Sequence, residues 1–228
     1  MSNAPDHARF SVIFPAGGAS RRFGSDKLSA DLAGLPVIAR AIASFAARDD
    51  VLELIVATDR RAELEPLVSL VATGAKLRWC RGGASRAATV RRGVEAATGR
   101  WVAVHDAARP ATPADVIDRV FAAAISQGAA APALPVKLTI KQAIGPLPAQ
   151  VLRTLPRDEL FEMQTPQAMR RIDLLNAYDR VDLPLDRVTD DVQLLELAGV
   201  AVLLVAGDER NLKITTPADL IAAAAAIQ

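Results

Sequence analysis

The sequence predicts an α/β fold in which helices cover both faces of a mostly parallel β-sheet. Short apolar runs of strand length alternate along the chain with longer segments of helical spacing. The short runs stay apolar from end to end, which is typical of strands buried on both faces. The segments between them are long enough to cross back over the sheet and bring in the next strand in parallel. Together these observations indicate a three-layer α/β/α, Rossmann-like architecture.

The expected strands and crossover helices follow directly from this pattern. The strands are residues 10–14, 52–57, 101–105 and 200–206, and the helices are residues 36–47, 86–97 and 113–126. Two helices should begin with the same signature, Thr-Pro-Ala-Asp, at residues 112–115 and 216–219. It offers a hydroxyl N-cap, a proline at the first helical position and an early carboxylate. The second copy opens an alanine-rich C-terminal helix.

The segment from Val136 to Thr154 departs from this alternation. Two β-prone pieces flank Gly145-Pro-Leu-Pro148, and neither has helical spacing. This pattern predicts a hairpin, which we expect to project from the fold as an arm at about 136–158. No internal repeat, low-complexity tract or linker divides the rest, so residues 1–228 are expected to form a single domain.

Composition excludes several classes of function. The 27 basic and 26 acidic residues leave a formal charge of +1, so no overall field favours nucleic acid or an anionic membrane. No apolar run approaches the roughly 18 residues of a membrane span. Cys80 is the only cysteine, which excludes an intramolecular disulfide and suits a reducing cytoplasm. We therefore expect a cytoplasmic protein without nucleic-acid or membrane partners.

Histidine chemistry is sparse as well. The chain has two histidines, His7 in the leader and His105 at the end of an expected strand. A serine–histidine mechanism would depend on His105 alone. No partner marks it as a base, so we interpret it as a packed or hydrogen-bonded core histidine.

A glycine-rich loop follows the first expected strand. It reads Pro15-Ala-Gly-Gly-Ala-Ser-Arg-Arg-Phe-Gly24 and is followed by Lys27. Small residues let backbone N–H groups approach a triphosphate, and Arg22 and Lys27 add positive charge. The alternative is a tight turn with solvated arginines. Neither the P-loop spacing nor the dinucleotide-binding Gly-x-Gly-x-x-Gly spacing is present.

The loop resembles the first signature of the sugar and polyol nucleotidyltransferases, including its continuation Leu32-Ala-Gly-Leu-Pro36, although Ser20 stands where that group usually has a second glycine. Further stretches narrow the resemblance to one family. They are residues 82–86 (Gly-Gly-Ala-Ser-Arg), 105–110 (His-Asp-Ala-Ala-Arg-Pro), 164–167 (Gln-Thr-Pro-Gln) and 211–219 (Asn-Leu-Lys-Ile-Thr-Thr-Pro-Ala-Asp). In this order they resemble the 2-C-methyl-D-erythritol 4-phosphate cytidylyltransferases. The resemblance runs from about Val12 to the C-terminal helix.

The resemblance implies a nucleotide site that binds CTP. Its residues would be Pro15, Ala16, Gly17, Gly18, Ala19, Gly83, Arg86, Thr89, Asp106 and Ala107. Gly83 could offer a backbone group to the pyrimidine, and Arg86 could instead only cap its own helix. Asp106 follows a strand at the carboxyl edge of the sheet, where α/β folds bind ligands, and a carboxylate there can take a hydroxyl or hydrated Mg²⁺. The alternative is that Asp106 and Arg109 form a structural ion pair. Ala88 stands where the family often has aspartate.

The resemblance also implies a site for the second substrate, a polyol phosphate. Its residues would be Asp106, Arg109, Thr139, Arg157, Thr165 and Lys213. In that family the arm crosses to a second subunit of a homodimer, so Thr139 and Arg157 would act in trans. Leu138, Pro156 and Arg210 replace residues that are often acidic there.

The implied reaction is an in-line attack by the acceptor phosphate on the α-phosphorus of CTP, with pyrophosphate leaving and no covalent intermediate. Such a reaction depends on positioning and charge stabilisation, which suits a site rich in Arg and Lys. The catalytic residues would be Arg22 and Lys27 at the triphosphate, and Arg157 and Lys213 at the attacking phosphate. Mg²⁺ would bridge the triphosphate oxygens, with Asp106 as its ligand, directly or through water.

Three alternatives stay open at this point. A ribitol-5-phosphate cytidylyltransferase shares the same signatures, and Leu138 and Arg210 are compatible with it. A molybdenum-cofactor nucleotidyltransferase is favoured only by the first motif, Gly18 to Lys27. A nucleotide-binding regulator without catalysis is the third, and the presence of Arg22, Lys27 and Lys213 together argues against it.

Overall fold

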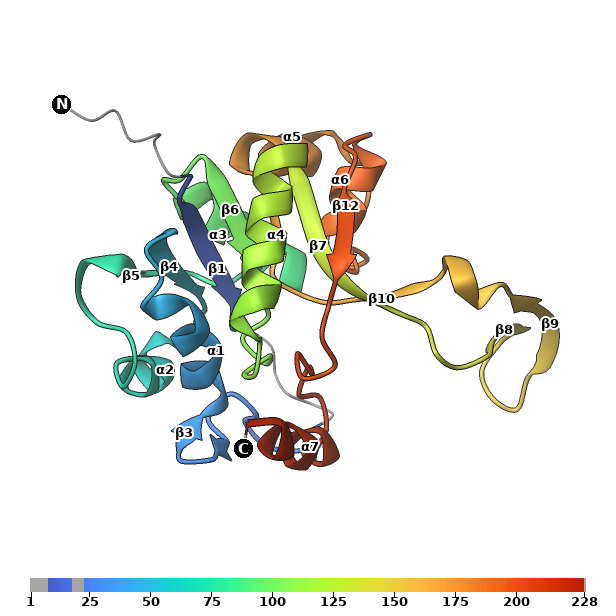
Figure 1. Ribbon diagram of the computed structural model, residues 1–228, viewed down its shortest axis with the longest axis horizontal. Coiled ribbons are helices and arrows are strands. Elements are labelled where there is room, and N and C mark those ends of the chain that lie inside the picture. Colours follow the sequence, from blue (N-terminus) through green and yellow to red (C-terminus); the bar gives the residue numbers. More distant parts are fainter. Residues whose placement is uncertain (1–7, 18–22, 228) are drawn as a thin grey trace.

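The computed structural model describes residues 8–17 and 23–227 and is built around an eight-stranded mixed sheet (Figure 1). The strand order is β10-β7-β11-β6-β1-β4-β5, and β12 also pairs with β7. The strands are β1 (Phe10–Pro15), β4 (Val51–Ala57), β5 (Leu77–Cys80), β6 (Trp101–Val104), β7 (Ala129–Pro135), β10 (Phe161–Met163), β11 (Gln167–Arg170) and β12 (Leu203–Ala206). All four expected strands are present, although β12 begins later than expected.

The sheet is mostly parallel, as the sequence predicts. β1 runs parallel to β4 and β6, β4 to β5, and β12 to β7. β11 is antiparallel to both β6 and β7, and β10 is antiparallel to β7. The antiparallel part was not predicted. It brings the segment before β11 next to the end of β6.

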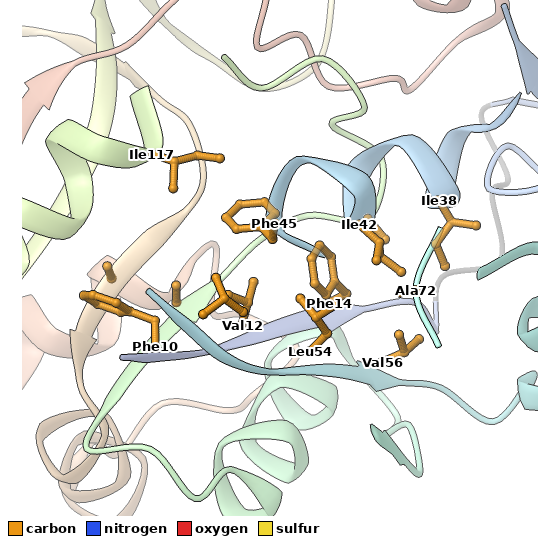
Figure 2. Packing of buried hydrophobic residues seen from close by; sticks show 14 of the residues in the cluster. Phe10, Val12, Phe14, Ile38, Ile42, Phe45, Leu54, Val56, Ala72 and Ile117 are labelled. Atoms are coloured by element: carbon orange, nitrogen blue, oxygen red, sulfur yellow. The ribbon is translucent and has the colours of Figure 1, made fainter. Parts of the chain in front are cut away.

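One face of the sheet packs against three helices. Phe10, Val12 and Phe14 of β1 point to this face, where they meet α1 (Val37–Ala46), α2 (Arg61–Val68) and α4 (Ala114–Gln127). Figure 2 shows side chains of α1 pointing toward β1 and β4. The ring of Phe14 meets that of Phe45 edge-on at 5.7 Å, and Phe10 stacks on Phe121 at 3.8 Å.

The opposite face packs against the remaining sheet-covering helices. Ile13 points to this side and joins a cluster with α3 (Arg86–Ala96), α5 (Arg171–Arg180) and α6 (Asp191–Leu197). α3 lies so close that a Cβ added to Gly93 would overlap the Cγ2 of Ile13. Both faces of β1 are therefore buried, and the three-layer α/β/α prediction is confirmed.

The two predicted helix starts behave differently. α7 (Pro217–Ile227) begins as expected, with Pro217 first and the Thr216 hydroxyl 3.4 Å from the Asp219 N–H that it caps. The prediction for α4 was wrong. Its N-cap is Pro113, without a side-chain cap, and the Thr112 hydroxyl instead donates to Asn211 Oδ1 at 2.8 Å. The hydroxyl that the local pattern assigned to the helix N-terminus therefore binds the buried side-chain amide of Asn211 instead.

The predicted arm is present as a separate two-stranded hairpin. β8 (Ile140–Ile144) and β9 (Gln150–Leu155) pair antiparallel, and a short 3₁₀ turn, η2 (Arg157–Glu159), leads back to β10. Figure 1 shows the hairpin projecting from the sheet beyond β10. Five of its apolar side chains are exposed, namely those of Leu138, Ile144, Leu147, Val151 and Leu152.

Three short elements complete the fold. They are β2 (Asp31–Leu32), β3 (Leu35–Pro36) and η1 (Gly74–Lys76). The hairpin of β2 and β3 packs on α7 through a small cluster that includes Leu32, Ile214 and Ala223. This cluster fixes the C-terminal segment beside the loop that carries Lys27. Within residues 8–17 and 23–227, no helix is long and apolar enough to cross a membrane.

Candidate functional site

A cleft of about 440 Å³ opens at the carboxyl ends of β1 and β6. Its walls come from the segments after these two strands, from the start of α3, and from two lysine-bearing loops. The lining residues are Pro15, Ala16, Gly17, Lys27, Leu28, Gly83, Ala84, Ser85, Arg86, Thr89, Asp106, Ala107, Ala108 and Lys213. Most of the residues predicted for the nucleotide thus share one cavity. Gly18, Ala19, Ser20 and Arg22 lie outside the described residues.

A second hollow of about 280 Å³ adjoins the first. It is lined by Arg86, Asp106, Arg109, Met163, Gln164, Thr165, Gln167, Thr189, Asp190 and Lys213. The two cavities share Arg86, Asp106 and Lys213. These three side chains therefore stand at the boundary between the two spaces.

Asp106 is the centre of a cationic cluster at this boundary. Its Oδ2 lies 2.7 Å from Lys213 Nζ and 3.8 Å from Arg109 Nε, and its Oδ1 lies 3.1 Å from Arg86 Nε. Burial by itself would raise the pKa of Asp106, but Arg86, Lys213 and Arg109 hold it far below its usual range. The carboxylate is therefore ionised. The contact with Arg109, which the alternative interpretation invoked as a structural ion pair, is present but is the longest contact of a larger group.

Arg86 is held by two carboxylates. Besides Asp106, its Nη2 lies 3.0 Å from Asp191 Oδ2. Burial would lower the pKa of Arg86, but Asp191 and Asp106 raise it overall, so the side chain stays charged. The alternative that Arg86 merely caps its own helix was wrong, because Ser85 is the N-cap and its side chain accepts from the Ala88 N–H at 3.1 Å.

Lys27 also lines the cleft and is fixed beside the loop that carries Lys213. Its Nζ donates to the carbonyl of Ile214 at 3.1 Å, next to Lys213 in the chain. Asp26, the preceding residue, accepts hydrogen bonds from Arg60, from Nη1 to Oδ1 at 3.1 Å and from Nη2 to Oδ2 at 2.6 Å. This pair anchors the loop from outside the cleft. Two lysines distant in sequence thus converge because one binds the backbone beside the other.

His105 lies beneath the cleft in a fully buried polar network. Its Nε2 is 3.1 Å from the Arg109 carbonyl, which can only accept, so Nε2 carries the proton. Nδ1 then accepts from the Thr165 hydroxyl at 3.1 Å, and that hydroxyl accepts from the Asp106 N–H, also at 3.1 Å. Burial lowers the pKa of His105 to about 4. The histidine is a neutral core residue, as expected.

The same network joins segments that are far apart in the sequence. Asn211 donates from Nδ2 to the Thr165 carbonyl at 2.8 Å, and its own carbonyl accepts from Arg109 Nη1 at 2.6 Å. The segments at 105–110, 164–167 and 211–219 are thereby locked together. Many polar groups of these segments hydrogen-bond to one another beneath the site. Asp106, Lys213 and Arg86 line the cavities above them.

The two predicted arm residues lie away from these cavities. Thr139 and Arg157 are exposed, and Arg157 Nη1 donates to the Lys137 carbonyl at 2.7 Å. Neither lines the cleft or the second hollow. Figure 1 shows that the arm that carries them projects from the sheet beyond β10.

Sequence reasoning missed Thr189 and Asp190, which border the second hollow, and the adjacent Asp191. Asp190 accepts from the Gln193 N–H at 2.9 Å and so caps α6, a function that its sequence context indicates. Asp191, the next residue, is fully buried behind Arg86. The only signal in the sequence is that two acidic residues, Asp190 and Asp191, stand at the helix start, where one is enough for the cap.

The donor set fits a magnesium ion that arrives with a nucleotide. Among the described residues, no group of three His, Cys, Asp or Glu side chains could hold a metal alone. Within the same part of the chain, Asp106 is the one carboxylate that lines the nucleotide-sized cleft. Mg²⁺ commonly binds through one or two carboxylates together with substrate phosphates and water. Asp106 could serve in this way beside a triphosphate.

Comparison with known proteins identifies the relatives of this chain. Residues 10–228 match the family model IspD, 2-C-methyl-D-erythritol 4-phosphate cytidylyltransferase. The enzyme of that name from Deinococcus radiodurans is 38% identical over 218 residues, covering 95% of this chain and 89% of the relative. The bifunctional enzyme IspD/IspF from Anaeromyxobacter dehalogenans is 40% identical over 217 residues, and the match spans 56% of its length.

A solved structure shows the same likeness in three dimensions. The crystal structure of 2-C-methyl-D-erythritol 4-phosphate cytidylyltransferase from Thermus thermophilus has a TM-score of 0.78 and 34% sequence identity. The superposition covers 96% of this chain and 100% of that one.

Proposed function

The chain belongs to the 2-C-methyl-D-erythritol 4-phosphate cytidylyltransferase family, and on that premise we propose that it transfers CMP from CTP to 2-C-methyl-D-erythritol 4-phosphate. The products are 4-diphosphocytidyl-2-C-methyl-D-erythritol and pyrophosphate. One observation carries the proposal: Lys27, Arg86 and Lys213 line one cavity, and Arg86 and Lys213, together with Asp106, also line the adjoining hollow. Two phosphorylated substrates need two adjoining spaces with shared positive charge between them.

We assign the larger cleft to CTP. Gly17 follows β1 directly and can offer its backbone N–H to a triphosphate, and Lys27 adds charge to the same wall. Gly83 and Thr89 line the same cleft, and the Gly83 N–H donates to Thr89 Oγ1 at 3.0 Å. We assign these two residues to the cytidine. The same proposal assigns further residues to the nucleotide, namely Pro15, Ala16, Gly18, Ala19, Arg22 and Ala107.

The second hollow takes the acceptor. Lys213 and Arg109 supply positive charge for its phosphate, and Asp106 accepts from a hydroxyl group of either substrate. Thr165 borders the same hollow, although its hydroxyl already has two partners in the protein. Placed here, the acceptor phosphate can approach the α-phosphorus of CTP along the line opposite the leaving pyrophosphate.

The side chains act by positioning and by charge. An ionised phosphate needs no base to attack, and His105 is neutral and buried, so no proton relay is required. Lys27 and Arg22 would stabilise the charge that develops on the triphosphate, and Lys213 would hold the attacking phosphate. Asp106 would hold the Mg²⁺ that accompanies CTP, directly or through water, and the ion would neutralise part of the triphosphate charge.

We further propose a homodimer in which the arm of one chain completes the site of the other. The arm exposes Leu138, Leu147 and Leu152, an apolar set that a second chain could cover. Thr139 and Arg157 lie on the same arm, away from the site of their own chain. They would therefore contact the acceptor of the partner subunit. We also propose that residues 1–228 act as one nucleotidyltransferase domain in the cytoplasm, a setting that its single cysteine suits.

A pyrophosphate-release assay tests the proposed reaction. Each of CTP, UTP, ATP and GTP is combined with either 2-C-methyl-D-erythritol 4-phosphate or ribitol 5-phosphate, in the presence of Mg²⁺. We expect release only with CTP and the methylerythritol phosphate. Faster turnover of ribitol 5-phosphate would overturn the acceptor assignment, and a preference for another nucleotide would overturn the assignment of the cleft to cytidine.

A further inference from the structure

A second carboxylate, Asp191, lies behind Arg86 and has no role in the reaction described above. It is the first residue of α6 and is 0% exposed. Its Oδ2 is 3.0 Å from Arg86 Nη2, whereas its Oδ1 is buried without a hydrogen-bond partner among the described residues. Tyr178 lies close enough to interact with Asp191, and burial together with that carboxylate raises the pKa of Tyr178, but the hydrogen bond of its hydroxyl goes to the Ala87 carbonyl at 2.9 Å.

Such a carboxylate is costly to the folded protein. Burying a charge is unfavourable unless its hydrogen bonds are complete, and one oxygen here is left without any. Burial raises the pKa of Asp191 despite the opposing effect of Arg86. A neutral residue would pack at the start of α6 at lower cost. The contact with Arg86 is what the carboxylate adds.

The contact fixes the orientation of the Arg86 side chain. The guanidinium is planar, and it is bound at Nε by Asp106 and at Nη2 by Asp191. Contacts at two of its nitrogens, with two different carboxylates, restrict the rotation of the group. Nη1 has no hydrogen-bond partner within residues 8–17 and 23–227 and could serve a ligand. Because Arg86 lines both cavities, this orientation decides which groups of a bound nucleotide it can reach.

Asp191 is itself held rigidly. Gln167, at the start of β11, accepts with Oε1 from the backbone N–H groups of Asp191 and Val192 at 3.0 and 3.2 Å. Its Nε2 donates to Asp190 Oδ2 at 2.9 Å. The first turn of α6 is thereby pinned to the sheet, so the carboxylate behind Arg86 has little freedom to move.

We propose that Asp191 is a positioning residue for CTP binding: it holds the Arg86 guanidinium from behind, in the plane in which Arg86 meets the nucleotide. This inference rests on the proposed function, which assigns Arg86 to CTP. Asp191 itself does not touch the substrate, so every effect of replacing it must pass through Arg86.

The test is a double-mutant cycle on CTP affinity, measured by calorimetric titration and as the KM for CTP. Asp191→Asn keeps the shape of the side chain and removes its charge, and we expect CTP affinity to fall about tenfold with a smaller change in kcat. Arg86→Ala should weaken CTP binding at least as much. In the Arg86→Ala background, adding Asp191→Asn should change CTP affinity less than about twofold, since the residue then has nothing to position.

Glu53→Gln provides a matched control. Glu53 is also a buried carboxylate, 4% exposed, and it receives hydrogen bonds from Ser11, Thr98 and Arg78 at a distance from both cavities. Glu53→Gln should lower the melting temperature and leave the KM for CTP unchanged. If Asp191→Asn does not fold, Asp191→Glu keeps the charge but displaces it by one methylene, and the same cycle is run with it.

The outcomes separate this inference from the proposed function. Unchanged CTP affinity in Arg86→Ala would overturn the assignment of Arg86 to the nucleotide. Weak binding in Arg86→Ala combined with normal binding in the Asp191 variant would overturn only the positioning role. An equal loss from the Asp191 substitution in both backgrounds would also overturn it, because Asp191 would then act independently of Arg86.

Discussion

At the scale of single residues, the proposed mechanism depends most directly on the charge of the two cleft lysines, Lys27 and Lys213. Lys27→Ala should lower kcat by at least about a hundredfold, on the order of 3 kcal/mol of lost transition-state stabilisation. Steady-state pyrophosphate release measures this. Lys76→Ala serves as the control, because Lys76 binds the Arg48 carbonyl outside both cavities and should retain full turnover. Wild-type kcat in Lys27→Ala would refute the catalytic role of Lys27.

The buried His105 makes a prediction about stability. Its pKa is lowered to about 4 from 6.5, so between these values the unfolded chain binds a proton that the folded chain does not. Stability should therefore fall as the pH drops from 6.5 toward 4, by up to about 3 kcal/mol from this residue. Urea unfolding at pH 7 and pH 5 measures the loss. His105→Gln should be less stable at pH 7 but lose less on acidification, and an equal loss in both proteins would contradict the prediction.

The positions of single residues could be predicted where the residue's own neighbours in the sequence indicate its environment. Asp106 was located because it directly follows a strand, and His105 was interpreted correctly because no partner marked it as a base. Thr112 and Asp191 show the limit. Their nearest neighbours in sequence indicate a helix cap, but Thr112 binds Asn211, 99 positions away, and Asp191 binds Arg86, 105 positions away. No local pattern contains such a contact.

At the scale of elements, the close packing of α3 on β1 predicts that a glycine-to-alanine substitution in α3 lowers stability, the opposite of what helix propensity predicts. Alanine normally stabilises a helix interior relative to glycine by up to about 1 kcal/mol. Gly93→Ala should instead destabilise the protein by roughly 1–3 kcal/mol, because the new Cβ would overlap the buried, β-branched Ile13. Urea unfolding provides the measurement. A more stable Gly93→Ala variant would mean that the helix can shift away from the strand.

The elements that escaped prediction have weak local signals. β7 consists largely of alanine and includes Pro132 and Pro135, residues of low strand propensity, and it is held by partners on both sides. β11 is short and begins and ends with polar residues, Gln167 and Arg170. Both strands depend on contacts with distant segments. In contrast, β1, β4 and β6 consist mainly of apolar residues, so their own composition predicts that they are buried strands.

At the scale of the whole molecule, the proposed arm exchange makes a quantitative prediction. Arg157→Ala and Lys213→Ala should each be strongly impaired alone. When the two variants are co-refolded, a dimer with one chain of each kind has one site with both native residues if the arm acts in trans. Random pairing should restore about a quarter of wild-type activity per chain. If the arm served its own chain, mixing would restore nothing.

The cluster around Asp106 also determines how the site is organised before any ligand arrives. Three cationic side chains, Lys213, Arg86 and Arg109, contact this one carboxylate, so their mutual repulsion is offset only in part. The contacts hold the three side chains together, and the excess positive charge stays available to phosphate groups. A ligand therefore meets a preorganised cationic centre, and less side-chain entropy is lost on binding than if the three groups moved freely.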